Sequence, residues 1–256
     1  MPPDLTRQGR ELAWDGCLNV RDLGGLPTED LDETRYRRVV RADSVRLLTA
    51  AGWQAAADYG IRTVVDLRGD HELRDDPPGE LPLDVVHVPF MEANEEEWQA
   101  ILDEIEAAAE AAPDAAAATR DVYLIFLDHF RHRAAAGVRA VARAPAGGVV
   151  VHCVGGKDRT GLLCAFLLQL AGVGIDHIAA DYALSEERLR PRQEEWLAQA
   201  ETEAERERLR RGAETPAESM VGGFAELERR YGGATQYLRD AGASDKDLTL
   251  ASARLR

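Results

Sequence analysis

The sequence predicts an α/β fold in which a mostly parallel central sheet is flanked by helices. Short apolar runs of strand length, at residues 61–67, 85–90 and 149–151, alternate with longer stretches of helical periodicity. Polar residues follow these runs, as they do at the carboxyl edge of a parallel sheet. Because 256 residues are enough for one substantial core, we expect a single domain over residues 1–256.

Composition narrows the class of protein. The chain has 46 acidic and 31 basic residues, a formal charge of −15, which argues against a general nucleic-acid or anionic-membrane binder. Residues 1–15 lack the apolar core of a signal peptide, and no later apolar run is long enough to cross a membrane. Cys17, Cys153 and Cys164 form neither a metal-like pair nor an even disulfide set, so the cytoplasm is the expected compartment. Export by a route without a cleavable signal stays open as an alternative.

The N-terminal part begins with a block of turn formers. Residues 14–25 end in a glycine pair and predict a loop with a short strand. Arg21 and Asp22 within this block have two interpretations. They support an active site from behind, or they form a structural ion pair in a turn, which is the preferred interpretation. Cys17 is expected to be a small buried hydrophobe. Residues 36–41 suit an edge strand.

The next elements bring carboxylates to one edge of the sheet. A helix over residues 49–59, with a threonine N-cap and a glycine stop, precedes a parallel strand over residues 61–67. Asp66 then falls at the carboxyl end of that strand. A third strand over residues 85–90 ends near Glu92, so these side chains point to the same rim.

Two helical stretches follow. Residues 95–120 are acidic and alanine-rich, with a break at Pro113, and indicate either a mobile flap or a weakly packed solvated helix. Residues 121–143 return to helical periodicity. His129 and His132 on this stretch are expected to be exposed, because no carboxylate or third histidine completes a metal site. We therefore expect no metal and no cofactor.

The central stretch is a strand, a glycine loop and a helix. The strand at residues 149–151 leads directly into His152 and Cys153. The two glycines of the loop after it, Gly155 and Gly156, are expected to adopt backbone torsions that a side chain would forbid. A helix from Thr160 to Ala171 is apolar nearly all round, so we expect it to be the central buried helix. Its N-terminus would present free N–H groups and the positive end of the helix dipole to an anion.

Two anions could use that position. One is the thiolate of Cys153, which a helix N-terminus stabilises relative to the thiol. The other is a phosphate, cradled by the loop amides and held by the guanidinium fork of Arg159. The nucleophile and its target would then meet. Cys164 on the helix is expected to be a core residue, with a disulfide that shields Cys153 as the alternative.

These residues resemble a known family. His152, Cys153, five further residues and then Arg159, Thr160 and Gly161 resemble the signature loop of the cysteine-based protein tyrosine phosphatases. Lys157 and Asp158 inside the loop are similar to a bacterial branch with dual or triple specificity, which acts on phosphotyrosine, phosphoserine or phosphothreonine, and phosphoinositides. Residues 19–25 and 231–242 resemble terminal segments of the same branch, and we expect residues 231–242 to dock as a terminal helix. The resemblance implies the protein tyrosine phosphatase-like fold and hydrolysis of phosphate monoesters.

The resemblance also implies roles for the loop residues. Cys153 would attack phosphorus to give a cysteinyl-phosphate that water hydrolyses. Arg159 and the backbone amides of Val154, Gly155 and Gly156 would stabilise the equatorial oxygens in the transition state. His152 would orient the loop, and Thr160 would donate its hydroxyl to the thiolate.

The general acid is open among three carboxylates, in the order Asp158, Glu92 and Asp66. The structural alternative for Asp158 is a hydrogen bond that stiffens the loop, and for Asp66 it is a salt bridge to Arg68 or Arg41. Lys157 is interpreted as a second cation for a substrate with more than one phosphate or acidic group, or as an ordinary solvated lysine.

A charged insertion follows the loop. Charged residues make up more than half of residues 186–211, and Glu186 with Arg190 and Glu207 with Arg211 have i,i+4 spacing, so we expect an exposed helix. By position, residues 186–230 resemble a helical lid over the active site. The alternative is a solvated helical excursion in which Leu189, Trp196 and Leu197 pack on the body.

Three functions are compared. The preferred one is a phosphatase whose substrate is a phosphorylated protein or lipid. The second is a phosphatase of nucleotides or other small metabolites, because the loop fixes the reaction and the surrounding walls fix the substrate. The third is a silent phosphate-binding module, against which the intact Cys153 and Arg159 argue. A nucleoside-triphosphate loop is excluded because Lys157 is followed by Asp158, where that motif has serine or threonine.

Overall fold

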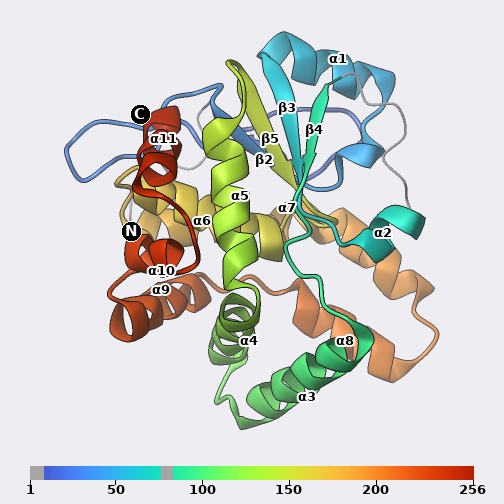
Figure 1. Cartoon of the computed structure of the whole chain (residues 1–256). Helices are drawn as coiled ribbons and strands as arrows, with labels where there is room; N and C mark the ends of the chain where they lie inside the picture. Colours follow the sequence, from blue (N-terminus) through green and yellow to red (C-terminus); the bar gives the residue numbers. More distant parts are fainter. Residues whose placement is uncertain (1–8, 76–82) are drawn as a thin grey trace.

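The computed structural model describes residues 9–75 and 83–256. In this part of the chain a five-stranded sheet has the order β1-β2-β5-β3-β4 (Figure 1). Strands β2, β5, β3 and β4 are parallel, and β1 pairs antiparallel with β2. The strands are β1 (Arg21–Asp22), β2 (Val39–Ala42), β3 (Ile61–Asp66), β4 (Asp84–His87) and β5 (Gly148–His152). The expected mostly parallel α/β architecture is therefore confirmed.

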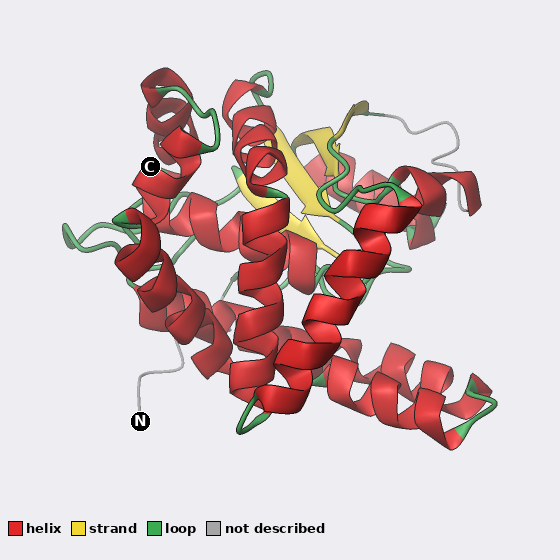
Figure 2. Ribbon diagram, turned by 60° about the horizontal axis from the view of Figure 1, so that its bottom comes forward, coloured by secondary structure: helices red, strands yellow, loops and turns green. Residues whose placement is uncertain are grey.

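Helices surround this sheet, and in Figure 2 the yellow strands are seen between them. In chain order they are the short 3₁₀ helix η1 (Val45–Leu47), α1 (Ala50–Tyr59), α2 (Asp70–Asp75), α3 (Glu95–Ala111), α4 (Ala115–His129), α5 (Arg131–Arg143), α6 (Asp158–Leu170), α7 (Ile175–Gln199), α8 (Glu203–Ala213), α9 (Ala217–Tyr231), α10 (Ala234–Asp240) and α11 (Asp245–Leu255). None of the helices described here has the length and hydropathy that crossing a membrane requires.

The central strand β5 is buried on both faces. Val149 and Val151 belong to the larger core, which contains residues of α5 and α6, while Val150 belongs to a second core with α1. This division follows from the alternation of side chains along a strand. Figure 1 shows α5 lying across one face of the sheet. Burial on both faces explains why the strand reads as a continuous apolar run.

Helix α6 is the central helix of the fold. Its residues from Thr160 to Leu168 are all buried, as its apolar sequence predicts. Phe166 stacks on Tyr237 of α10 with the ring centroids 5.5 Å apart. The helix begins at Asp158 rather than Thr160, so its free N–H groups start inside the loop that is predicted to bind phosphate. Cys164 is a buried core residue, as expected.

Several sequence predictions need correction. The strand expected at residues 36–41 lies at 39–42 and is not at the edge, because the two-residue strand β1 pairs with its outer side. The strand expected at residues 85–90 is confined to 84–87. The helix expected over residues 121–143 is two helices that meet at Phe130. Residues 231–242 do contain a docked helix, but α11 follows it as the terminal helix.

Candidate active site

The loop between β5 and α6 presents unoccupied backbone donors. Cys153 follows the last residue of β5 and is buried, with 3% of its surface exposed. Within the described chain, the backbone N–H groups of residues 154–157 have no hydrogen-bond acceptor. The first N–H groups of α6, from Asp158 onward, are also free of intrahelical partners by geometry. The loop that follows the thiol therefore carries a run of unpaired backbone donors, which is a feature of anion-binding loops at helix N-termini.

Three consecutive loop carbonyls are held on the opposite side. Val154 O accepts from Ser44 N at 2.9 Å. Asn19 Nδ2 donates to Gly155 O at 3.1 Å and to Gly156 O at 3.2 Å. Arg41 Nη2 also donates to Gly156 O, at 2.8 Å. Because these carbonyls are fixed to the scaffold, the N–H groups of the same peptides are left for a ligand.

Gly156 is the glycine that the loop requires. Its φ is +64°, and a Cβ there would lie 2.2 Å from Ala42 O, so a side chain would collide with β2. Gly155 differs, since its φ is not positive and a Cβ would meet only Leu189 Cδ1 at 3.7 Å. The expectation that both glycines are required by backbone torsion is therefore wrong for Gly155.

A buried cluster of charges lies behind the loop, where three arginines meet one aspartate. Arg21 Nε lies 3.0 Å from Asp181 Oδ1, Arg41 Nη1 lies 2.7 Å from Oδ2, and Arg10 also pairs with this carboxylate. All four side chains are at most 1% exposed. Burial alone would raise the pKa of Asp181, but the three positive charges hold it well below its usual value.

The ion pair that the sequence suggests between Arg21 and Asp22 does not form. Arg21 turns inward to Asp181 and to Asn19 Oδ1. Asp22 instead accepts from the backbone N–H groups of Gly24 and Arg37, each at 2.7 Å. Arg21 thus orients Asn19, which holds two loop carbonyls, and so supports the site from beneath.

Arg159 is paired with a residue that the sequence reasoning missed. Its Nη2 lies 2.8 Å from Glu72 Oε1, and its Nη1 bonds Oε2 of the same carboxylate. Gly69 N also donates to Glu72, at 2.6 Å. Burial would raise the pKa of Glu72, but Arg159 lowers it, so the carboxylate is charged. The available signal was an acidic residue soon after the strand at residues 61–67, in what is now helix α2. The pairing with Glu72 fixes the Arg159 fork beside the loop.

His152 and Asp66 end neighbouring parallel strands side by side. His152 Nε2 lies 3.5 Å from Asp66 Oδ2, and Nδ1 lies 3.0 Å from the oxygen of Cys153. Burial lowers the pKa of His152, so the ring is neutral near pH 7. Asp66 Oδ2 lies 2.8 Å from Arg68 Nη2, so of the two arginines in the structural alternative for Asp66, Arg68 is the partner.

Comparison with known proteins agrees with this arrangement. The model of the tyrosine phosphatase family matches residues 12–256. The chain belongs to this family.

Similar proteins bear the same kind of name. Triple specificity protein phosphatase PtpB of Mycobacterium tuberculosis is 30% identical over 90% of this chain and 93% of the relative. A protein of Cupriavidus necator named as a tyrosine-protein phosphatase is 31% identical over 73% of this chain and 67% of its own length. A tyrosine-protein phosphatase of Nostoc commune is 27% identical over 84% and 73%. The chain is thus a phosphatase of the tyrosine phosphatase family.

The three candidate acids of this tyrosine phosphatase have different surroundings. Asp158 is in the first turn of α6, with 43% of its side chain exposed, and accepts from Tyr123 OH at 2.6 Å. Glu92 accepts from Asp70 N at 2.8 Å, at the start of the helix that carries Glu72. Asp66 is buried, and although burial alone would raise its pKa, Arg68 and His152 hold that pKa below its usual value.

Lys157 does not point into solvent, which corrects one of its two interpretations. Its side chain is 12% exposed, its ammonium donates to Gly212 O, and Asp158 Oδ1 lies 3.4 Å away. Gly212 is near the end of α8, so the ammonium group of Lys157 is tied to the charged insertion.

Thr160 Oγ1 is buried and finds no hydrogen-bond partner in the described residues. In that same part of the chain, no group of three or more His, Cys, Asp or Glu side chains could hold a metal ion.

The charged insertion of the phosphatase meets the loop at two points. Leu189 of α7 is 2% exposed and lies over Gly155, and Gly212 accepts from Lys157. Trp196 does not pack on the body as expected, since it is 38% exposed. Of the two expected i,i+4 pairs, Glu207 with Arg211 forms at 3.5 Å, whereas Glu186 accepts from Thr215 N.

Helix α9 has a different character from the rest of the insertion. Met220, Phe224 and Leu227 are buried in the larger core. The segment that meets the loop without belonging to this core is therefore the last part of α7 together with α8.

Proposed function

We propose that this phosphatase hydrolyses phosphate monoesters of protein tyrosine, and also of serine and threonine, through a cysteinyl-phosphate intermediate. The observation that carries the proposal is the run of free loop N–H groups after Cys153, in a loop that ends at Arg159, whose guanidinium interacts electrostatically with Cys153. The wider substrate range, with phosphoinositides as a further class, is supported by similarity to a relative named for triple specificity.

In the first step the Cys153 thiolate attacks phosphorus, forming the S–P bond as the P–O bond to the leaving group breaks. The loop amides and Arg159 stabilise the charge on the equatorial oxygens. In the second step water attacks phosphorus, the S–P bond breaks and inorganic phosphate leaves. Thr160 donates its hydroxyl to the thiolate, first when the thiolate attacks and again when it leaves as the S–P bond breaks. This role is consistent with a buried Oγ1 that has no other partner in the described chain.

We propose Asp158 as the group that protonates the leaving oxygen and then takes a proton from water. Its carboxylate is at the loop and partly exposed, so it can reach a bound substrate. Asp66 is a weaker candidate because its salt bridge with Arg68 stabilises the charged form, which holds no proton to give. Glu92 is engaged at the N-terminus of α2.

The covalent mechanism is tested with Cys153→Ser. We expect hydrolysis of a phosphotyrosine peptide to fall to background while the variant still binds that peptide, measured by calorimetry. Cys17→Ser is the matched control, because its thiol donates to Ser44 O, and a hydroxyl can do the same. Normal turnover by Cys153→Ser would exclude a cysteinyl-phosphate.

The general acid is tested by changing the leaving group. Asp158→Asn should lower kcat for phenyl phosphate by roughly 10²- to 10⁴-fold. The loss should be far smaller for p-nitrophenyl phosphate, whose leaving oxygen needs little protonation. Glu92→Gln and Asp66→Asn are the comparisons. If Glu92→Gln alone showed this dependence on the leaving group, Glu92 would be the acid.

We also propose that the chain is a single domain. Within it, the end of α7 and the whole of α8 form a lid over the loop. The contacts of Leu189 with Gly155 and of Lys157 with Gly212 support this. The lid would be residues 186–214, shorter than residues 186–230, because α9 belongs to the core.

A further inference from the structure

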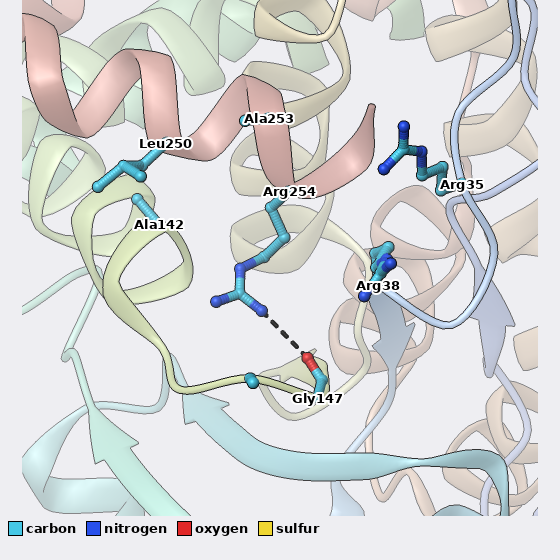
Figure 3. A pocket seen from close by; sticks show the side chains of 8 residues that line it. Arg35, Arg38, Ala142, Gly147, Leu250, Ala253 and Arg254 are labelled. Atoms are coloured by element: carbon cyan, nitrogen blue, oxygen red, sulfur yellow. Dashed lines mark hydrogen bonds between the residues drawn. The ribbon is translucent and has the colours of Figure 1, made fainter.

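A second basic site lies at the opposite end of the sheet from the phosphate-binding loop. A pocket of about 340 Å³ is lined by residues of α11, by the end of α5 and by the segments that lead into β2 and β5. Figure 3 shows Arg254 reaching from α11 toward Gly147, with Arg35 and Arg38 on the neighbouring side of the pocket. The five residues of β5 separate Gly147 of this pocket from Cys153, a distance of roughly 20 Å.

Three guanidinium groups line the pocket, and within the described chain no carboxylate lines it. Arg254 is held in place by backbone carbonyls, with Nη1 3.1 Å from Gly147 O and Nη2 3.3 Å from Pro145 O, as well as a bond to Ala144 O. These acceptors are neutral, so the charge of Arg254 has no counter-ion there. The side chains of Arg35 and Arg38 have neither a hydrogen bond nor an ion pair with any residue in the ranges 9–75 and 83–256.

Two arginines on neighbouring elements have a carboxylate partner, unlike Arg254. The formal charge of the chain is −15, so carboxylates are abundant. Arg143 lies 2.7 Å from Asp247, and Arg239 lies 2.7 Å from Asp245. Arg254 has no such partner, and burial, followed by the positive charge of Arg38, lowers its pKa. The like charges repel one another at this place, and a bound anion would remove that repulsion.

We propose that this pocket binds a small phosphate-bearing anion, separately from the phosphate-binding loop. Guanidinium forks match phosphate oxygens in pairs, and three of them provide more donors than one phosphoryl group can use. The volume lies in the range of small-molecule sites. Leu250 and Ala142 form an apolar wall opposite the arginines, which would accommodate a short carbon skeleton. The ligand class is therefore a diphosphate, or a phosphate monoester with a small apolar part.

Pyrophosphate is the probe, and backbone amide NMR of the full chain reports each site separately. We expect titration to shift the amides of residues 146–148 and of residues 253 and 254 with one dissociation constant, and those of residues 154–157 with another. Arg38→Ala should weaken the first binding event about tenfold and leave the second unchanged. Arg35→Ala should act in the same direction. Both arginines are on the surface, so these variants should fold.

Lys246→Ala is the matched control, because it removes an exposed cation from α11 that does not line the pocket. It should leave the first dissociation constant unchanged. Equal weakening by Lys246→Ala and Arg38→Ala would show general charge attraction and overturn the proposal. So would the absence of shifts at residues 146–148 at millimolar pyrophosphate. Sodium sulfate at the same ionic strength should bind at least tenfold more weakly, and equal binding would refute the assignment to phosphate.

Discussion

At the scale of single residues, Asp181 decides the charge balance beneath the loop. Arg10, Arg21 and Arg41 are fully buried around this one carboxylate. Three guanidinium groups around one carboxylate leave the cluster with an excess of positive charge. Burial, and then the charge of Arg41, lower the pKa of Arg21. Arg41 also donates to Gly156 O, so the same cluster that needs Asp181 fixes the loop peptide.

Removal of this carboxylate should therefore be costly. We expect Asp181→Asn to lower the free energy of unfolding by about 3–5 kcal/mol, because it leaves buried guanidinium groups without a counter-charge. Urea denaturation measures the change. Glu194→Gln, which neutralises an exposed carboxylate on the same helix, should change stability by less than about 0.5 kcal/mol. Similar stabilities for the two variants would mean that Asp181 is not required to balance the arginines.

At the scale of elements, α6 and α8 differ strongly in how much of each helix is buried. Helix α6 is buried along most of its length and holds the loop from one side. Helix α8 has no buried residue, and its surface carries the ion pairs of Glu203 with Arg210 and of Glu207 with Arg211. Exposed pairs of this kind contribute little to stability. Helix α8, which contacts the loop through Gly212 and Lys157, is thus stabilised less by packing than the core helices.

Hydrogen exchange should show this difference. We expect the amides of α8 to exchange at least roughly 100-fold faster than those of α6, because α8 can open without exposing core residues. Mass spectrometry of the native protein measures both helices in one experiment. Helix α9, which follows α8 but is packed in the larger core, serves as the internal comparison. Equal protection of α8 and α9 would contradict a weakly held lid.

The sequence predicts elements whose determinants are local. The loop from His152 to Thr160 and the helix after it are readable because residue type and spacing lie within one short stretch. The partners of that loop cannot be read from the sequence in this way. Glu72 is 87 residues away from Arg159, and Asn19 is 136 residues away from Gly155. No periodicity links such positions. The short strand expected within residues 14–25 is present as β1, but the edge position expected for β2 was wrong, because no local pattern shows that β1 pairs with the outer side of β2.

At the scale of the whole molecule, an anionic protein has to attract an anionic substrate. The formal charge is −15, and the basic groups of the loop act against it only at short range. Arg159 is moreover neutralised in part by Glu72. The long-range field therefore opposes the approach of phosphorylated, acidic substrates.

Salt should screen that repulsion before it weakens the local contacts. We expect kcat/KM for a phosphotyrosine peptide with flanking glutamates to rise by roughly two- to fivefold between 10 and 100 mM NaCl, as the Debye length falls from about 30 to about 10 Å. A peptide with flanking lysines should show the opposite trend. Steady-state kinetics on both peptides measures the effect. A decline for both would show that local attraction controls association.

The meeting of Arg10, Arg21 and Arg41 with Asp181 also has a consequence for protein synthesis. The arginines leave the ribosome early, whereas their carboxylate is 140 to 171 residues further along the chain. A nascent chain that ends just after the phosphate-binding loop already contains Cys153 and Arg159, yet its buried cations have no counter-charge. The catalytic pocket should thus become competent only after α7 has emerged, which prevents a half-made chain from binding phosphate.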